Sequence, residues 1–250
     1  MTNFKSRLQL DQTLYGLWST LSSPNVAELI GGAGFDWLLF DSEHAPIELA
    51  DLVSLLRAAD RSPSALAVRI SWNDEVLIKR VLDLGVQNLF IPFVENADEA
   101  QKAVQATRYP PNGKRGLAGA TRASSYGRNR NYIEQASENI CLIGQIETPE
   151  AVENIAEIAA VDGLDGVFIG PSDLSASMGY PGRADHPEVQ GMIRNCAEQL
   201  NQLGKPAGIL APDELVARRY AKWGYRFIAA GVDASLLVRA TDNLLKELLK

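Results

Sequence analysis

Short apolar runs alternate with amphipathic segments from one end of the chain to the other, and no linker rich in Ser, Gly or Pro divides it. The apolar runs predict eight buried β-strands: Tyr15–Ser19, Asp36–Asp41, Ala65–Ile70, Asn88–Pro92, Ile140–Glu147, Gly166–Gly170, Pro206–Leu210 and Phe227–Gly231. The amphipathic segments predict a helix after each strand, at residues 24–33, 47–59, 74–84, 97–107, 149–160, 187–203, 212–223 and 233–249. This repeated strand–helix unit is typical of a parallel α/β fold.

A single closed barrel fits this pattern best. Barrels of eight strands and eight helices commonly need about 250 residues, and this chain has 250. The alternative is an open, doubly wound sheet, but SSPNVAELIGG follows the first strand and no GxGxxG motif stands at that turn. We therefore predict one (β/α)8 TIM barrel domain over residues 1–250.

Composition and charge narrow the function. The chain carries 24 Lys+Arg against 31 Asp+Glu, a net charge of −7, and only 7% aromatic residues. This balance argues against a nucleic-acid-binding surface and favours small-molecule substrates. The N-terminus lacks the apolar core of a secretory signal, which predicts a cytoplasmic protein. Cys141 and Cys196 have no CxxC spacing and are expected to be buried small apolar side chains.

The C-terminal ends of the strands are where barrel enzymes place their chemistry. Glu147 and Asp173 each follow an apolar run, where a charged group needs a partner or a cation. Two carboxylates from successive strand ends can hold Mg²⁺ or Mn²⁺ and leave positions open for a 2-oxoacid. The alternative is that both are ordinary acids bonded to backbone. Trp18, Asp41, His44 and Arg69 lie at other strand ends, and Gln145 lies at the same strand end as Glu147.

Three of these features allow both a functional and a purely structural interpretation. His44 follows Asp41 closely enough for that carboxylate to orient its imidazole as a general base, although a lone histidine can also be a structural hydrogen-bonder, as expected of His186. Arg69 could stabilise a developing enolate or form an internal salt bridge. The segment from Gly170 to Ser175 reads as a turn entering a helix, whose free N–H groups could hold a carboxylate.

Several motifs taken together resemble the HpcH/HpaI aldolase family, and they span nearly the whole chain. The motifs are FDWLL at 35–39, DSEHAP at 41–46, RYPPNGKRG at 108–116, QIET at 145–148, GPSDLS at 170–175 and GIL at 208–210. The resemblance is to class II pyruvate aldolases of the 4-hydroxy-2-oxoheptanedioate and 2-dehydro-3-deoxyglucarate types. Two positions depart from the common pattern: Ser42 stands where Gly is usual, and Gly144 where Val is usual.

The resemblance implies a metal-dependent barrel that assembles as a hexamer, a trimer of dimers with an exchanged C-terminal helix. It implies reversible cleavage of 4-hydroxy-2-oxoacids, such as 4-hydroxy-2-oxoheptanedioate or 5-dehydro-4-deoxyglucarate, to pyruvate and an aldehyde through a metal-stabilised enolate. The metal would be Mg²⁺, Mn²⁺ or Co²⁺. By this resemblance Glu147 and Asp173 are the metal ligands, and His44 is the base with Asp41 as its partner. Arg69 and Gln145 contact pyruvate, and the backbone at Gly170, Ser172 and Asp173 holds its carboxylate. Trp18 and Leu210 flank the aldehyde.

Other mechanisms and functions remain as alternatives. A class I aldolase needs a lysine in the barrel interior, and no predicted strand has one: Lys79, Lys102 and Lys222 fall on helical segments. A citramalyl- or malyl-CoA-type lyase would share the acid pair but needs a surface for the CoA nucleotide. A non-catalytic barrel that binds 2-oxoacids would show ligand-dependent stabilisation without turnover.

Two further segments carry predictions. The stretch from Arg108 to Arg130 holds six basic residues and no acid, so it is either a solvated loop or subunit contact, or a segment in which Arg122 or Arg128 binds a distal substrate carboxylate. The C-terminal segment carries an apolar face that suits either the core or a partner subunit, with residues Leu236, Leu237, Val238, Leu244, Leu245, Leu248 and Leu249.

Overall fold

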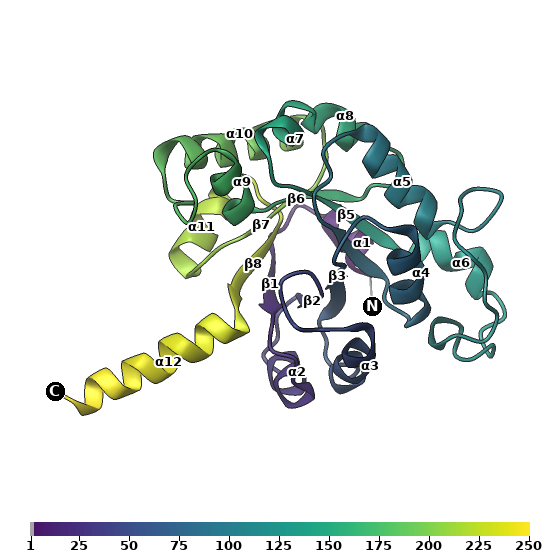
Figure 1. Ribbon diagram of the computed structural model, residues 1–250, viewed down its shortest axis with the longest axis horizontal. Helices are drawn as coiled ribbons and strands as arrows, with labels where there is room; N and C mark the ends of the chain where they lie inside the picture. Colours follow the sequence, from purple (N-terminus) through teal and green to yellow (C-terminus); the bar gives the residue numbers. More distant parts are fainter. Residues whose placement is uncertain (1–2) are drawn as a thin grey trace.

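The computed structural model describes residues 3–250 and shows eight parallel strands closed into a barrel in the order β1 to β8 (Figure 1). The strands are β1 (Leu14–Ser19), β2 (Trp37–Asp41), β3 (Ala65–Arg69), β4 (Asn88–Ile91), β5 (Cys141–Ile146), β6 (Gly166–Ile169), β7 (Ala207–Leu210) and β8 (Phe227–Val232). Each predicted strand is found with its ends shifted by at most a residue. This closed order confirms the predicted barrel, and its strands are largely apolar, as expected where one face meets the barrel interior and the other the helix layer.

Helices follow the strands, and all but α1 and α12 lie around the outside of the barrel (Figure 1). They are α1 (Phe4–Leu8), α2 (Pro24–Gly31), α3 (Leu49–Ala58), α4 (Glu75–Asp83), α5 (Ala97–Thr107), η1 (Arg122–Ser124), α6 (Tyr132–Asn139), α7 (Pro149–Glu153), α8 (Ile155–Ala160), α9 (Pro171–Ser177), α10 (Pro187–Gln202), α11 (Glu214–Lys222) and α12 (Asp233–Leu248). The helix predicted at 149–160 is two helices, because the chain breaks at Asn154, whose side-chain amide donates to the Glu95 carbonyl at 2.9 Å.

Aromatic side chains fill the barrel interior. Trp37 stacks on Phe90 with ring centroids 5.7 Å apart, and Phe227 packs edge-on against both rings. These rings need glycine beside them: a Cβ on Gly16 would come within 2.1 Å of Trp37, and one on Gly208 within 2.2 Å of Phe227. The N-terminal helix α1 closes the amino end of the barrel with apolar side chains, so the carboxyl end is left for chemistry.

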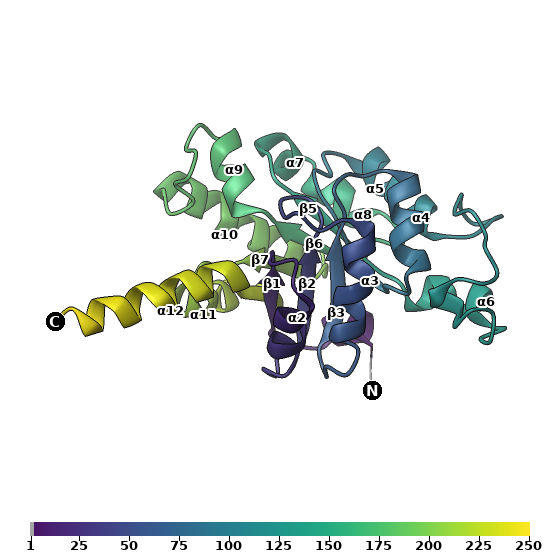
Figure 2. The ribbon, with the colours of Figure 1, turned by 60° about the horizontal axis from the view of Figure 1, so that its bottom comes forward.

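The C-terminal helix α12 leaves the barrel and projects away from it (Figures 1 and 2). Its apolar side chains Leu236, Leu237, Val238, Leu244, Leu245, Leu248 and Leu249 are exposed, with Leu249 at 78%. In the described chain this face is therefore not part of the core, which excludes the first of the two alternatives left by the sequence. No helix among residues 3–250 is both long enough and apolar enough to cross a bilayer. Cys141 and Cys196 are free and buried, as predicted.

Candidate active site

A cavity of about 200 Å³ opens at the carboxyl ends of the strands. Its walls come from the carboxyl ends of β1, β2, β3, β5, β6, β7 and β8 and from the segments that follow β1, β2, β5 and β6, so residues far apart in sequence meet there. The lining includes most of the predicted site residues, namely Trp18, Asp41, His44, Arg69, Gln145, Glu147, Gly170, Ser172, Asp173 and Leu210. Thr20, Phe168, Pro171 and Val232 complete it.

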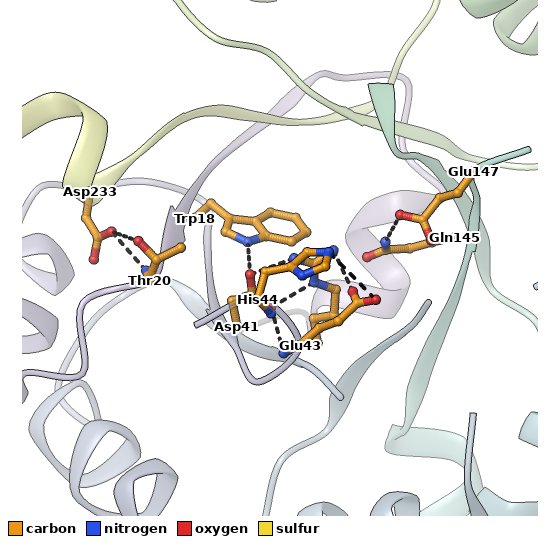
Figure 3. A network of polar contacts seen from close by, with 9 residues as sticks. Trp18, Thr20, Asp41, Glu43, His44, Gln145, Glu147 and Asp233 are labelled. Carbon is orange, nitrogen blue, oxygen red and sulfur yellow. Dashed lines mark hydrogen bonds and ion pairs between the residues drawn. The ribbon is translucent and has the colours of Figure 1, made fainter. Parts of the chain in front are cut away.

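Arg69 and Asp41 form a buried ion pair at the floor of this cavity. Arg69 Nε donates to Asp41 Oδ1 at 2.8 Å and Nη2 donates to Asp41 Oδ2 at 2.6 Å. The Trp18 indole N–H donates to Asp41 Oδ2 at 3.1 Å (Figure 3). The Arg69 guanidinium lies 4.9 Å from the Trp18 ring centroid. Burial acts to raise the pKa of Asp41, but the Arg69 hydrogen bonds and charge outweigh it and hold the pKa below its ordinary value. The salt bridge foreseen as one role of Arg69 is thus present.

His44 is oriented differently from the sequence-based prediction. Asp41 Oδ1 accepts from the backbone N–H of Glu43 at 3.0 Å and of His44 at 3.4 Å, and its side-chain contacts go to Arg69 and Trp18. The carboxylate beside the imidazole is instead Glu43, whose Oε1 lies 3.9 Å from His44 Nε2. The expected pairing of Asp41 with the His44 ring is therefore wrong for this conformation, because the guanidinium already occupies both oxygens of Asp41.

Glu43 links the histidine to the arginine. Its Oε2 lies 2.8 Å from Arg69 Nη1, so the two side chains form an ion pair. The angles of this contact are not those of a hydrogen bond, and no other group within residues 3–250 donates a hydrogen bond to this buried oxygen. Burial, reinforced by the charges of Asp41 and Asp173 and opposed by Arg69, raises the pKa of Glu43 to about 7. Sequence reasoning did not assign Glu43 a role, although it stands inside the polar run that closes β2.

Glu147 is held by contacts on both of its oxygens. Oε2 accepts from the Phe93 backbone N–H at 2.9 Å, and Oε1 accepts from Gln145 Nε2 at 2.9 Å (Figure 3). Phe93 has φ of +49°, an unfavourable conformation for this residue that aims its N–H at the carboxylate. Gly170 leaves the space that Glu147 needs, because a Cβ there would come within 2.5 Å of Oε1. Neither Phe93 nor the steric role of Gly170 could be read from sequence, since both depend on the packing of different loops.

Asp173 stands in the first turn of α9, half-buried and facing the same cavity. It is near enough to Glu147 for its charge to act on that side chain. Burial is the main cause that raises the pKa of Glu147 to about 7, and the charges of Glu43 and Asp173 add to it. Nearby negative charges that raise the pKa of Glu43 and Glu147 favour a cation at this cavity.

The residues at this site fit a divalent cation. Hard cations prefer carboxylate and amide oxygens, and Gln145 Oε1 is a buried oxygen that lacks a donor among the described residues. Residues 3–250 contain no cluster of three or more His, Cys, Asp or Glu side chains placed to hold a metal. A cation here would therefore have the two carboxylates Glu147 and Asp173 as protein ligands and would need other oxygen ligands, which matches the sparse ligand set expected from sequence.

Arg122 and Arg128 lie away from the cavity of their own chain. Arg122 Nη1 donates to the Leu84 carbonyl at 2.7 Å and Nη2 pairs with Asp60 at 3.4 Å, both in loops that precede strands at the amino end of the barrel. A separate cavity of about 410 Å³ opens there. Arg128 is exposed and donates to the Ser125 carbonyl at 3.2 Å. Neither arginine lines the cavity of its own chain, so the suggestion that either holds a substrate carboxylate stays a prediction.

Fold and cavity together define this protein as a (β/α)8-barrel enzyme. The family model for HpcH/HpaI aldolase/citrate lyase matches residues 14–240. The chain belongs to this family, and it is an aldolase, a carbon–carbon lyase. The resemblance drawn from the sequence motifs is confirmed.

Individual relatives support the same assignment. The chain is 50% identical over 243 residues to a 4-hydroxy-2-oxo-heptane-1,7-dioate aldolase of Escherichia coli, covering 97% of this chain and 93% of the relative. A crystal structure of an HpcH/HpaI aldolase/citrate lyase family protein from Burkholderia cenocepacia J2315 matches all of both chains with a TM-score of 0.97 and 40% identity. The structure of the citrate synthase SbnG matches with a TM-score of 0.87 and 28% identity, covering 98% of this chain and 96% of that one.

Proposed function

We propose that this aldolase cleaves 4-hydroxy-2-oxoacids reversibly to pyruvate and an aldehyde, with a divalent cation (Mg²⁺, Mn²⁺ or Co²⁺) held by Glu147 and Asp173. The observation that carries the proposal is the convergence of these acids with Arg69, His44 and the donor-free oxygen of Gln145 on one small cavity. None of the eight strands within residues 3–250 contains a lysine. This favours metal-assisted over Schiff-base chemistry.

The chain's own groups divide the remaining work. Retro-aldol cleavage needs a base for the C4 hydroxyl proton and positive charge where the enolate oxygen develops. His44, with its side chain 59% exposed at the cavity mouth, takes that proton, and Glu43 at 3.9 Å stabilises the imidazolium that results. Arg69, fixed by Asp41, supplies a permanent positive charge. A bound divalent cation would act as the Lewis acid that polarises the 2-oxo group.

Other lining residues are assigned to binding. The first-turn N–H groups of α9 at Ser172 and Asp173 have no acceptor within their own helix, so they can hold the substrate carboxylate beside Gly170. Trp18 and Leu210 flank the aldehyde end of the cavity. The substrates proposed are 4-hydroxy-2-oxoheptanedioate and 5-dehydro-4-deoxyglucarate, and the name of the 50% identical relative supports the first.

A coupled assay for pyruvate release tests the proposal. Both substrates are offered to protein treated with EDTA and then to the same protein with Mg²⁺ restored. We expect release only after Mg²⁺ is restored, because the acids alone cannot supply a Lewis acid. Full activity after exhaustive metal removal would contradict the metal assignment, and absence of release from both substrates in either arm would contradict the reaction.

The exposed face of α12 supports assembly with other copies of this chain. Seven apolar side chains on a helix that projects into solvent form a surface that a monomer rarely leaves uncovered. Closed symmetry is the common way to cover such a surface. We propose that α12 is exchanged between two subunits and that three such dimers form a hexamer.

Light scattering after size-exclusion chromatography tests this assembly. We expect a species of six times the 27.2 kDa chain mass. Leu244→Asp combined with Leu248→Asp should yield smaller species, since both side chains lie on the exposed apolar face. Lys246→Asp is the matched control because it places the same charge on a polar position of the helix. A monomeric wild type, or an unchanged mass in the double variant, would argue against the exchanged helix.

A further inference from the structure

Thr20 lines the side of the cavity opposite the acid pair. It directly follows β1, whereas Gln145 lies within β5 and Glu147 directly follows it, across the barrel. Figure 3 shows Thr20 and Asp233 on one side of Trp18, and Gln145 with Glu147 on the other. In the proposed reaction the 2-oxoacid end is held beside Glu147 and Asp173, which leaves the side of the cavity lined by Thr20 for the aldehyde.

Asp233 fixes the direction of this hydroxyl. Asp233 begins α12 and is only 5% exposed. Its Oδ1 accepts from Thr20 Oγ1 at 3.0 Å and from the Thr20 backbone N–H at 2.9 Å, while Oδ2 accepts from Ser19 Oγ at 2.7 Å. A hydroxyl has one hydrogen and two lone pairs. Because the hydrogen goes to Asp233, Thr20 Oγ1 can act toward the cavity only as an acceptor.

Apolar side chains line the strand ends next to Thr20. Leu210 ends β7 and Val232 ends β8, the strand that pairs with β1, and both line the cavity. The indole N–H of Trp18 is already donated to Asp41. An aldehyde that carries a hydroxyl group can donate to Thr20 there, whereas a hydrocarbon chain of the same size leaves the acceptor without a donor, which costs free energy.

We propose that Thr20 is a specificity residue that selects aldehydes with a hydroxyl on the carbon next to the carbonyl, and that Asp233 is its positioning residue. The inference rests on the proposed aldol reaction. The cavity of about 200 Å³ is small, so an acceptor in its wall lies near the reacting carbonyl. By this criterion 5-dehydro-4-deoxyglucarate, which releases a 2-hydroxyaldehyde, suits the site better than 4-hydroxy-2-oxoheptanedioate, which does not.

The test uses aldol synthesis from pyruvate with glycolaldehyde and with propionaldehyde, which differ by a hydroxyl in place of a methyl group. In Thr20→Val we expect kcat/KM for glycolaldehyde to fall about five- to tenfold, the effect of one uncharged hydrogen bond, and that for propionaldehyde to stay unchanged. Thr20→Ser should retain the wild-type ratio of kcat/KM for glycolaldehyde to kcat/KM for propionaldehyde, and Asp233→Asn should lower this ratio. Ser19→Ala is the matched control, because it removes another contact of Asp233 from a buried residue outside the cavity wall.

A second readout separates this inference from the proposed reaction. Exchange of the pyruvate methyl protons with D₂O, followed by NMR in the presence of Mg²⁺, reports enolate formation without any aldehyde. Wild type and Thr20→Val should exchange equally. Intact exchange with the same glycolaldehyde-to-propionaldehyde ratio in wild type and Thr20→Val would overturn the role of Thr20. Loss of exchange in the wild type would overturn the proposed reaction itself.

Discussion

Asp173→Asn and Glu147→Gln should each lower Mg²⁺-dependent pyruvate release on the order of 10³-fold. Each substitution removes one of two carboxylate ligands, and the Lewis-acid contribution of a metal is worth several kcal/mol in the transition state. Both variants should fold, because Asp173 is half-buried and a neutral Gln at 147 can still receive the Phe93 N–H. The measurement is kcat/KM for pyruvate release at several Mg²⁺ concentrations, with circular dichroism to verify the fold.

Glu150→Gln is the matched control, since it neutralises an exposed acid on α7, the helix that follows the same strand. Its activity should equal that of the wild type. If Asp173→Asn and Glu147→Gln kept more than about a tenth of the activity at saturating Mg²⁺, a role for these acids as metal ligands would be excluded, because a lost ligand costs more than that.

The same acids give the site a defined pH dependence. The pKa of Glu147 rises from its ordinary value of 4.5 to about 7 in the folded protein. In metal-free protein its contribution to stability is therefore fully present below pH 4.5 and is lost as the pH rises through 7. Protons compete with the metal for this carboxylate. Mg²⁺ should thus raise the melting temperature more at pH 8 than at pH 6, and in Glu147→Gln the shift should be small at both.

Arg69→Met should abolish detectable turnover and lower the free energy of unfolding by about 3–5 kcal/mol, the usual effect of leaving one member of a buried ion pair alone. Asp41 would then keep its charge at 1% exposure with only the Trp18 and backbone donors. Turnover should fail because no other permanent cation of the described chain lines the cavity. Urea unfolding and the pyruvate-release assay measure the two effects separately.

A double variant distinguishes the structural from the catalytic role of Arg69. Adding Asp41→Asn to Arg69→Met removes the stranded charge, so the double variant should be more stable than Arg69→Met alone. Turnover should stay absent, because the positive charge near the enolate oxygen is still missing. Recovery of activity together with stability would show that Arg69 only supports the fold, and the assignment of Arg69 to the enolate would be withdrawn.

Much of the active site was accessible from sequence because barrels collect the residues that end their strands. Glu147 and Asp173 follow apolar runs directly, and Arg69 is the last residue of β3, so their positions along the chain predict that they meet. The helix α9 and the short α6 were less evident, because a helix of two turns leaves a weak periodic pattern. Glu43 and Thr20 stand in the same strand-end positions and were overlooked, since a single polar residue there does not reveal its partners.

The sequence by itself determined the order of the strands and the main helices, the closed parallel barrel and most of the polar side chains at its mouth, because apolar periodicity and strand direction are local properties of the chain. Only the tertiary structure decided which groups pair. It joined Asp41 to Arg69 rather than to the imidazole of His44, and it placed Arg122 at the opposite end of the barrel. Such pairings depend on distances between atoms from different loops, and these distances exist only once the barrel has closed.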